Sequence, residues 1–180
     1  YGDGFIKLLK SASEKVSDKK KPVVFSYFVN DPERYGVVQF NTNKNVISVE
    51  EKPSNPKSNY AIVGLYFYPN DVVQIAKRVK PSNRGELEIT SINNIYLENN
   101  NLDVEILGRG FTWLDTGTID SLLEASNFIQ TIEKRQGLKV SCIEEIAFLM
   151  GFIDKLKLKK IIQSYLGTPY GKYLSKLIWV

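Results

Sequence analysis

The chain has 180 residues, of which 43% are hydrophobic and 24% are charged, and its net charge is +4. This length and composition are typical of a globular domain with a buried core. The sequence contains no histidine and a single cysteine, Cys142. These counts exclude an internal disulfide, a histidine general base and a histidine-ligated zinc site.

The same features favour some surroundings and partners over others. One cysteine fits a reducing compartment, so we expect a cytoplasmic protein. We expect no membrane association, because no apolar run is long enough to cross a bilayer and no signal peptide is visible. The lysines at positions 15, 19, 20 and 21 are typical of a solvated helix end, and we expect no nucleic-acid binding.

From residue 5 to residue 68 the pattern predicts one helix followed by strands. Residues 5–17 have the apolar spacing of an amphipathic helix, and residues 23–29 form an apolar run typical of a buried strand. Residues 36–40 and 46–50 then predict a hairpin, and residues 60–68 predict another apolar strand.

Helices and a strand alternate in the next part of the chain. Asp71 is expected to cap a short helix over residues 72–79, because a side-chain oxygen at that position accepts from the first turn. Residues 86–98 predict a longer helix, and residues 102–107 predict a strand.

Beyond Thr118 the pattern is helical. Thr118 is expected to be the N-cap of a helix that ends near residue 135. Shorter helices are expected at residues 142–150, 154–165 and 169–178. Strands and helices that alternate up to about residue 135, followed by helices alone, predict an α/β fold with one sheet layer and a helical C-terminal extension.

Asp115 is the first candidate for a functional side chain. It ends the apolar run 111–114 and precedes a Thr-Gly-Thr turn, which places a charged oxygen ligand at a strand end, where α/β folds build their sites. A hard oxygen ligand without neighbouring histidine or cysteine suits Mg²⁺. The local sequence alone leaves a metal ion, a substrate and an ordinary salt bridge open.

Three other segments place glycine or charged residues beside strands. Gly36 opens a strand, which would let a ligand approach the backbone closely. Glu51 and Lys52 follow the next strand and suit sugar hydroxyls and a phosphate, and Arg84 suits a phosphate that binds two N–H groups. Each has an ordinary alternative: a turn glycine, a solvated strand end, or a loop followed by acidic residues that favour the helix dipole.

Aromatic side chains near these segments are mostly expected in the core. Tyr66 is the exception best suited to contact a ligand, because Gly64 precedes it. Lysine, arginine, glutamate and an aspartate without histidine together indicate phosphate chemistry on a polar substrate.

Five segments, taken in order, resemble those of the glucose-1-phosphate thymidylyltransferase family. They are residues 31–38, 50–53, 64–68, 84–90 and 113–118. Each is weak alone, whereas their shared order and spacing are specific. The resemblance continues to residue 174, so it covers essentially the whole chain, and it implies the second half of a Rossmann-like nucleotidyltransferase mixed sheet flanked by helices.

The resemblance implies an enzyme that makes dTDP-glucose and pyrophosphate from dTTP and glucose 1-phosphate. A phosphate oxygen of the sugar attacks the α-phosphorus in line, with Mg²⁺ as cofactor and without a covalent enzyme intermediate, so catalysis rests on positioning and electrostatics. The family's members assemble as homotetramers, and we expect a homo-oligomer.

The resemblance also implies roles for individual residues. Asp115 would be a metal ligand and, with Lys52, a catalytic residue. Lys52 and Arg84 would hold the sugar phosphate, and Glu51 would accept hydrogen bonds from glucose hydroxyls. The complete set of expected sugar-phosphate contacts is Tyr35, Gly36, Glu51, Lys52, Ile62, Tyr66 and Arg84. Residues 1–135 would form the sugar-phosphate-binding portion, and residues 136–180 a helical extension with oligomer contacts and a regulatory site.

A regulatory site for a dTDP-sugar is a further implication of the resemblance. Arg109, Glu145 and Ile146 match part of that site. Leu149 stands where the family often has an arginine, so we leave open whether feedback inhibition is kept.

The family's nucleotide-binding loop and base-reading residues match nothing in this chain, which begins with Tyr1. We therefore expect a fragment whose upstream part is missing, and no appreciable activity from the isolated chain. Two alternatives stay open: a nucleotidyltransferase that uses UTP or another nucleotide, and a non-catalytic module that binds a sugar phosphate.

Overall fold

The computed structural model describes residue 2 and residues 4–178, and the chain forms two compact units, residues 1–113 and 114–180. In the first unit the strands are β1 (Val23–Phe28), β2 (Gly36–Phe40), β3 (Val46–Glu51), β4 (Tyr60–Phe67) and β5 (Asp103–Leu107). Its helices are α1 (Phe5–Lys19), α2 (Val72–Ala76) and α3 (Ile89–Glu98), with a short 3-10 helix at Pro32–Arg34. The five strands predicted between residues 23 and 107 are present, with bounds within one residue of the prediction. The strand expected over the apolar run 111–114, with Asp115 at its end, is wrong, because Phe111 forms an isolated bridge to Gly2 and residues 112–114 are not in a strand.

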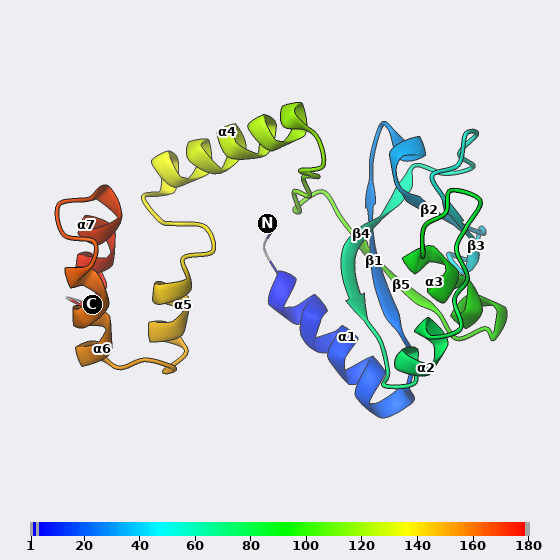
Figure 1. Cartoon of the computed structure of the whole chain (residues 1–180), viewed down its shortest axis with the longest axis horizontal. Coiled ribbons are helices and arrows are strands. Elements are labelled where there is room, and N and C mark those ends of the chain that lie inside the picture. The colour runs from blue at the N-terminus through cyan, green and yellow to red at the C-terminus, as the bar shows by residue number, and fades with distance from the viewer. Residues whose placement is uncertain (1, 3, 179–180) are drawn as a thin grey trace. The chain divides into compact units, whose positions relative to one another are not determined.

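The strands form one mixed sheet in the order β3-β2-β4-β1-β5 (Figure 1). β1 runs parallel to β5 and antiparallel to β4, and β2 runs antiparallel to both β3 and β4. The predicted α/β fold with a mixed sheet is therefore confirmed.

The register of β2 against β4 determines where the candidate site forms. β4 is paired with β1 as far as Phe67, whereas β2 pairs with β4 only at Ala61 and Tyr60. β2 thus begins, at Gly36, next to the N-terminal half of β4. The C-terminal half of β4 extends beyond the start of β2 and has no β2 residue beside it.

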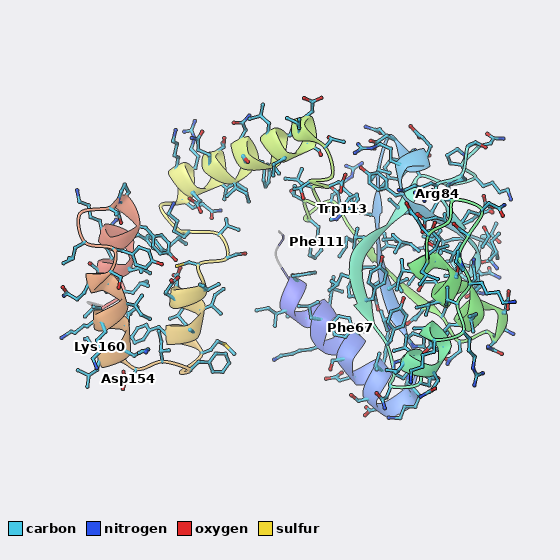
Figure 2. All side chains as sticks on the ribbon, in the orientation of Figure 1. Phe67, Arg84, Phe111, Trp113, Asp154 and Lys160 are labelled. Carbon is cyan, nitrogen blue, oxygen red and sulfur yellow. The ribbon has the colours of Figure 1, made fainter. Side chains whose placement is uncertain are left out.

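The two faces of the sheet carry separate cores, because successive side chains of a strand point to opposite faces. Val23 and Phe25 of β1 pack with Ala12 of α1. Val24 packs on the other face with Ile92 of α3. The aromatic side chains of Phe67, Phe111 and Trp113 join the α1 core (Figure 2).

Three local predictions about α2 and α3 are wrong. The helix expected at 86–98 begins at Ile89, because Glu88 is extended, and the acidic residues before it are not in a first helical turn. Asp71 precedes α2 but does not cap it with its side chain, because its Oδ1 accepts a hydrogen bond of 2.7 Å from the hydroxyl of Tyr96. α2 also ends at Ala76 rather than at residue 79.

The second unit is helical, as expected for the C-terminal extension. Its helices are α4 (Ile119–Gln136), α5 (Ile143–Leu149), α6 (Lys155–Gln163) and α7 (Pro169–Lys176). Thr118 is the predicted N-cap of α4, because its side chain accepts from the backbone N–H of Ser121. The compact units divide after Trp113. The boundary expected between residues 135 and 136, which separates the sugar-phosphate-binding portion from the helical extension by function, stays a prediction.

The last two helices of the second unit share a core around Leu158, Ile162 and Leu174. Asp154 and Thr168 cap these helices through hydrogen bonds to Lys157 N and Gly171 N. Within residue 2 and residues 4–178, no helix combines the length and the hydropathy that crossing a bilayer requires.

Gly171 provides a test of this helical packing. A Cβ atom at this position would lie 2.1 Å from the carbonyl oxygen of Tyr165. Gly171→Ala should therefore lower the free energy of unfolding of the helical unit by more than about 2 kcal/mol, measured by urea denaturation. Gly108→Ala is the control, because its Cβ would meet nothing within 4 Å. Equal effects of the two substitutions would contradict the packing.

Candidate functional site

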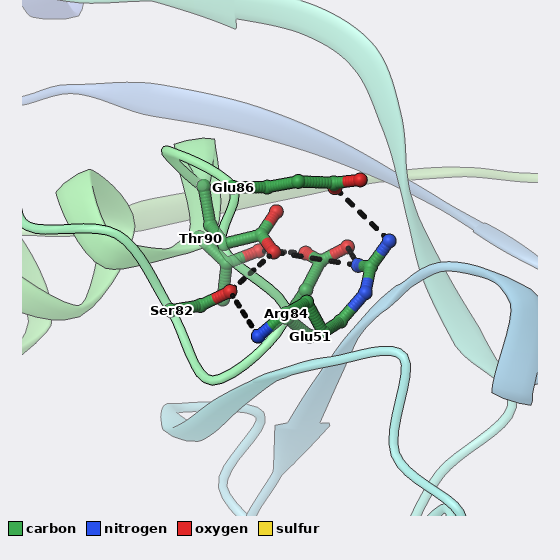
Figure 3. A network of polar contacts seen from close by, with 6 residues as sticks. Glu51, Ser82, Arg84, Glu86 and Thr90 are labelled. Atoms are coloured by element: carbon green, nitrogen blue, oxygen red, sulfur yellow. Dashed lines mark hydrogen bonds and ion pairs between the residues drawn. The ribbon is translucent and has the colours of Figure 1, made fainter.

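The carboxylate of Glu51 is the centre of the polar cluster in the first unit. Glu51 ends β3 directly opposite Gly36 of β2. Thr90 of α3 donates a hydrogen bond of 2.5 Å to its Oε2, and Nη1 of Arg84 lies 3.6 Å from its Oε1 (Figure 3). Two strands, one helix and one loop thus converge on a single carboxylate.

Gly36 makes this convergence possible. A Cβ atom at Gly36 would lie 3.1 Å from Oγ1 of Thr90 and 3.4 Å from Oε2 of Glu51. It would also lie 3.9 Å from Cβ of Ile62. A side chain at this position would press on the pair formed by Glu51 and Thr90, so the glycine leaves the space that this hydrogen bond needs.

Arg84 lies in a loop that holds its guanidinium among carboxylates. Nη2 lies 3.0 Å from Oε2 of Glu86, and Nη1 lies 3.3 Å from Oε1 of Glu88. Ser82 fixes the loop, because its hydroxyl donates to Glu88 at 2.9 Å and accepts from the backbone N–H of Arg84 at 3.2 Å (Figure 3). Each of the three carboxylates contacts one nitrogen of Arg84, and none holds both nitrogens in a bidentate pair. The N–H groups can therefore turn to an anionic ligand.

Tyr66 stands beside the same carboxylate. Burial, and next the negative charge of Glu51, raise the pKa of the Tyr66 phenol above its ordinary value. Its ring stacks on Tyr68 with a centroid distance of 5.9 Å, and Tyr68 stacks on Tyr96 at 5.8 Å. Tyr68 in turn donates a hydrogen bond of 2.6 Å to Oδ1 of Asn93. The ladder of tyrosines thus holds the Tyr66 ring in place.

Lys52 follows Glu51 with an unusual backbone. Its φ is +40°, in the left-handed region, and its N–H donates to the carbonyl of Tyr35 at 3.0 Å. Such conformations are costly for residues other than glycine and gather at functional sites. The ring of Tyr35 meets Trp113 edge to face with centroids 5.0 Å apart. The exposed Lys52 and the half-buried Tyr35 therefore flank the start of β2.

The structure brings all seven residues of the expected sugar-phosphate pocket to one place in the first unit. Tyr35, Gly36, Glu51, Lys52, Ile62, Tyr66 and Arg84 surround the start of β2. Their ligand-binding roles stay predictions. Sequence reasoning missed Thr90 and Ser82, which hold Glu51 and the Arg84 loop. Thr90 lay inside a recognised motif but was attributed to a plain helix.

The remaining candidate residues are spread over both units. Asp115 belongs to the second unit, where Oδ2 of its carboxylate lies 3.1 Å from the position of a Cβ at Gly117. Among residue 2 and residues 4–178, no group of three or more Cys, Asp or Glu is arranged to hold a metal ion. The predicted role of Asp115 as a Mg²⁺ ligand stays a prediction.

The predicted regulatory residues have these surroundings. Arg109, in the first unit, borders a pocket of about 470 Å³ whose wall includes Phe28 and Tyr60. In the second unit, Glu145 accepts a hydrogen bond of 2.5 Å from the hydroxyl of Tyr173, and Ile146 is exposed. A regulatory role for these residues stays a prediction.

The comparison with known proteins decides the family. The sequence matches the family described as nucleotidyl transferase over residues 1–132. The chain belongs to this nucleotidyl transferase family. The resemblance predicted from the five segments is also confirmed, because glucose-1-phosphate thymidylyltransferases from Neisseria meningitidis and Mycobacterium tuberculosis are 48% and 52% identical to it over 178 residues.

These relatives are longer than the chain. The aligned region covers 99% of this chain and 61% of the Neisseria protein, or 60% of the Mycobacterium protein. A solved structure from Bacillus anthracis, named as a candidate glucose-1-phosphate thymidylyltransferase in complex with sucrose, is 40% identical and has a TM-score of 0.57. That match covers 69% of this chain and 47% of the other.

A more distant structure has the same fold. A UDP-glucose pyrophosphorylase complexed with UDP-glucose has a TM-score of 0.62 at 21% identity, over 73% of this chain and 52% of the other. At this identity the likeness concerns the nucleotidyltransferase fold alone.

The proximity of Glu51 to Tyr66 can be tested directly. Glu51→Gln should lower the pKa of the Tyr66 phenol, but not to its ordinary value, because burial remains. NMR titration of labelled tyrosine rings measures this change. Glu50→Gln is the control, because Glu50 pairs with Lys57 at 2.8 Å on the opposite face of β3. An unchanged Tyr66 pKa in Glu51→Gln would contradict the geometry.

The raised pKa of Tyr66 makes the free energy of unfolding depend on pH. The folded state favours the protonated phenol, so this contribution is complete below about pH 10 and is lost as the pH rises through the folded-state pKa. The Glu51→Gln substitution should reduce this loss.

Proposed function

We propose that this chain provides the glucose 1-phosphate side of a thymidylyltransferase active site. The observation that carries the proposal is the convergence of Glu51, Tyr66 and Arg84 at the start of β2. A carboxylate acceptor, a phenol and a guanidinium in one place suit a ligand with both hydroxyl groups and a phosphate. The relatives at about half identity carry the name of an enzyme with such a substrate.

Each residue has a distinct part in the proposed site. Glu51 accepts hydrogen bonds from glucose hydroxyls, and the Gly36 backbone lies against the sugar. Arg84 turns from its carboxylate neighbours to the phosphate, and Lys52 adds a second positive charge. Tyr35, Ile62 and Tyr66 shape the wall of the pocket. Both cations would neutralise charge on the phosphate.

The proposed reaction is an in-line displacement. A phosphate oxygen of glucose 1-phosphate forms a bond to the α-phosphorus of dTTP, and the bond from that phosphorus to the pyrophosphate oxygen breaks. The products are dTDP-glucose and pyrophosphate. Lys52 and Arg84 would catalyse this step by holding the attacking phosphate in line and lowering the repulsion between two anions.

Asp115 suits one ligand position of a Mg²⁺ ion. A hard carboxylate oxygen fits this ion, which usually binds one or two protein carboxylates together with substrate phosphates. When bound, the ion would neutralise charge on the phosphates. We expect the second carboxylate to come from the nucleotide-binding portion, as the family resemblance implies.

The nucleotide and the assembly are parts of the same proposal. We assign dTTP from the relatives' names, and we expect turnover to need a nucleotide-binding portion in addition to this chain. A homo-oligomer fits the exposed apolar side chains of Ile143, Ile146 and Leu149 on α5, which offer a contact surface. We keep the cytoplasm and a dTDP-sugar regulatory site as further parts of the proposal.

The phosphate-binding role of Arg84 predicts a loss of affinity. Arg84→Ala should weaken binding of glucose 1-phosphate to the chain about 10- to 100-fold, because a charged hydrogen-bonding group is lost. Isothermal titration calorimetry measures the affinity, with glucose as the ligand that lacks the phosphate. Arg78→Ala, an exposed arginine outside the cluster, is the control. Equal affinity in wild type and Arg84→Ala would contradict the role.

The metal-ligand role of Asp115 predicts a loss of turnover instead. In the intact enzyme that carries this sequence, Asp115→Ala should lower kcat at least about 100-fold with near-normal glucose 1-phosphate affinity. Pyrophosphate release from dTTP measures kcat, and parallel assays with UTP test the choice of nucleotide. Asp120→Ala, in the first turn of α4, is the matched control. Unchanged turnover in Asp115→Ala would refute the role.

A further inference from the structure

We propose that Thr90 is a positioning residue for sugar recognition, because it fixes one oxygen of the Glu51 carboxylate and leaves the other for the sugar. This inference rests on the proposed function, since it assigns the ligand of Glu51 to a glucose hydroxyl. Thr90 is 4% exposed and lies in the first turn of α3. Its contact with the reaction is therefore indirect, through Glu51.

The geometry divides the two carboxylate oxygens. Oε2 accepts the 2.5 Å hydrogen bond from Oγ1 of Thr90, a length typical of a hydroxyl bonded to a charged carboxylate. Among residue 2 and residues 4–178, the contact of Oε1 is the longer one of 3.6 Å with Nη1 of Arg84. A carboxylate oxygen can accept two hydrogen bonds. Oε2 already accepts one, so it has less capacity for a ligand hydroxyl than Oε1, whose contact with Arg84 is longer than a hydrogen bond.

The local structure directs the Thr90 hydroxyl to Glu51. A threonine inside a helix often bonds back to the carbonyl four residues earlier. For Thr90 that carbonyl belongs to Glu86, and it already accepts from the backbone N–H of Ser82 at 2.8 Å. The hydroxyl instead reaches across the gap that Gly36 leaves, where a Cβ would stand 3.1 Å from it.

Loss of this hydroxyl should affect both parts of the substrate. Without the bond from Thr90, the Glu51 carboxylate can rotate toward Arg84 and form a closer ion pair. The sugar then loses an oriented acceptor, and the phosphate meets an arginine that is more tightly held. Both effects weaken ground-state and transition-state binding alike, so KM should rise while kcat changes little.

The test compares three variants of Thr90 in the 180-residue chain. Thr90→Val keeps the shape but removes the hydroxyl, and it should weaken glucose 1-phosphate binding about 5- to 30-fold by calorimetry. Thr90→Ser keeps the hydroxyl and should bind within about threefold of wild type. Thr90→Ala also removes the hydroxyl but has a smaller side chain, so it replaces Thr90→Val in the comparison with Thr90→Ser if valine does not fit. Ser91→Ala, at the next position of α3, is the control and should bind as wild type does.

A double-mutant cycle identifies the route of the effect. Thr90→Val should weaken glucose 1-phosphate binding much less in a Glu51→Gln background than in the wild type, because both substitutions remove the same oriented acceptor. In the intact enzyme, Thr90→Val should raise KM for glucose 1-phosphate by the same factor and leave kcat within about threefold of wild type.

Several outcomes would overturn the proposal, and they separate it from the proposed function. Additive penalties in the cycle, or a Thr90→Ser variant as weak as Thr90→Val, would show that Thr90 acts through packing. Wild-type affinity in Thr90→Val, with wild type binding normally, would contradict the role of Thr90 alone. A wild-type chain that does not bind glucose 1-phosphate would overturn the proposed function, and this inference with it.

Discussion

The candidate site depends on the contact between Glu51 and Thr90 across a glycine. Gly36 has no side chain to fill the space between Glu51 of β3 and Thr90 of α3, so the carboxylate of Glu51 and the hydroxyl of Thr90 can meet there. The contact joins two neighbouring strands to the helix that covers them. A buried or half-buried carboxylate needs such a donor, because burial without a hydrogen bond is costly. The site is therefore held together by the same bond that orients its acceptor.

The charge balance around Arg84 fits the proposed binding of an anion at a site that is not strongly basic. The guanidinium faces Glu51, Glu86 and Glu88, and none of the three contacts is shorter than 3.0 Å. Arg84 is also partly exposed, so these ion pairs contribute little to stability. Two oxygens of a tetrahedral phosphate can accept from the planar fork of N–H donors of the guanidinium. In the proposed site, a sugar phosphate would replace these carboxylates at Arg84 and leave Glu51 to the sugar.

Much of the fold could be predicted from the sequence, because apolar runs and turn residues report burial directly. The bounds of the strands between residues 23 and 107 and the N-cap at Thr118 are confirmed on this basis. The apolar run 111–114 forms no strand, although Phe111 and Trp113 pack in a core. The start of α3 was predicted three residues early, because the acidic residues after Gly85 suit either a loop or a first helical turn. Asp71 was predicted as a cap, and its partner is Tyr96, twenty-five residues away in sequence. Thr90 was missed for the same reason, since its contact with Glu51 joins residues that are 39 apart.

NMR of the isotopically labelled chain during titration with glucose 1-phosphate tests the central claim most directly. If the cluster at the start of β2 binds the sugar phosphate, the largest shifts in backbone amide signals should occur at Gly36, Glu51, Arg84 and Thr90. The helical unit, residues 114–178, should change little. No shifts at saturating ligand, or shifts confined to the helical unit, would contradict the assignment of this cluster as the sugar-phosphate site.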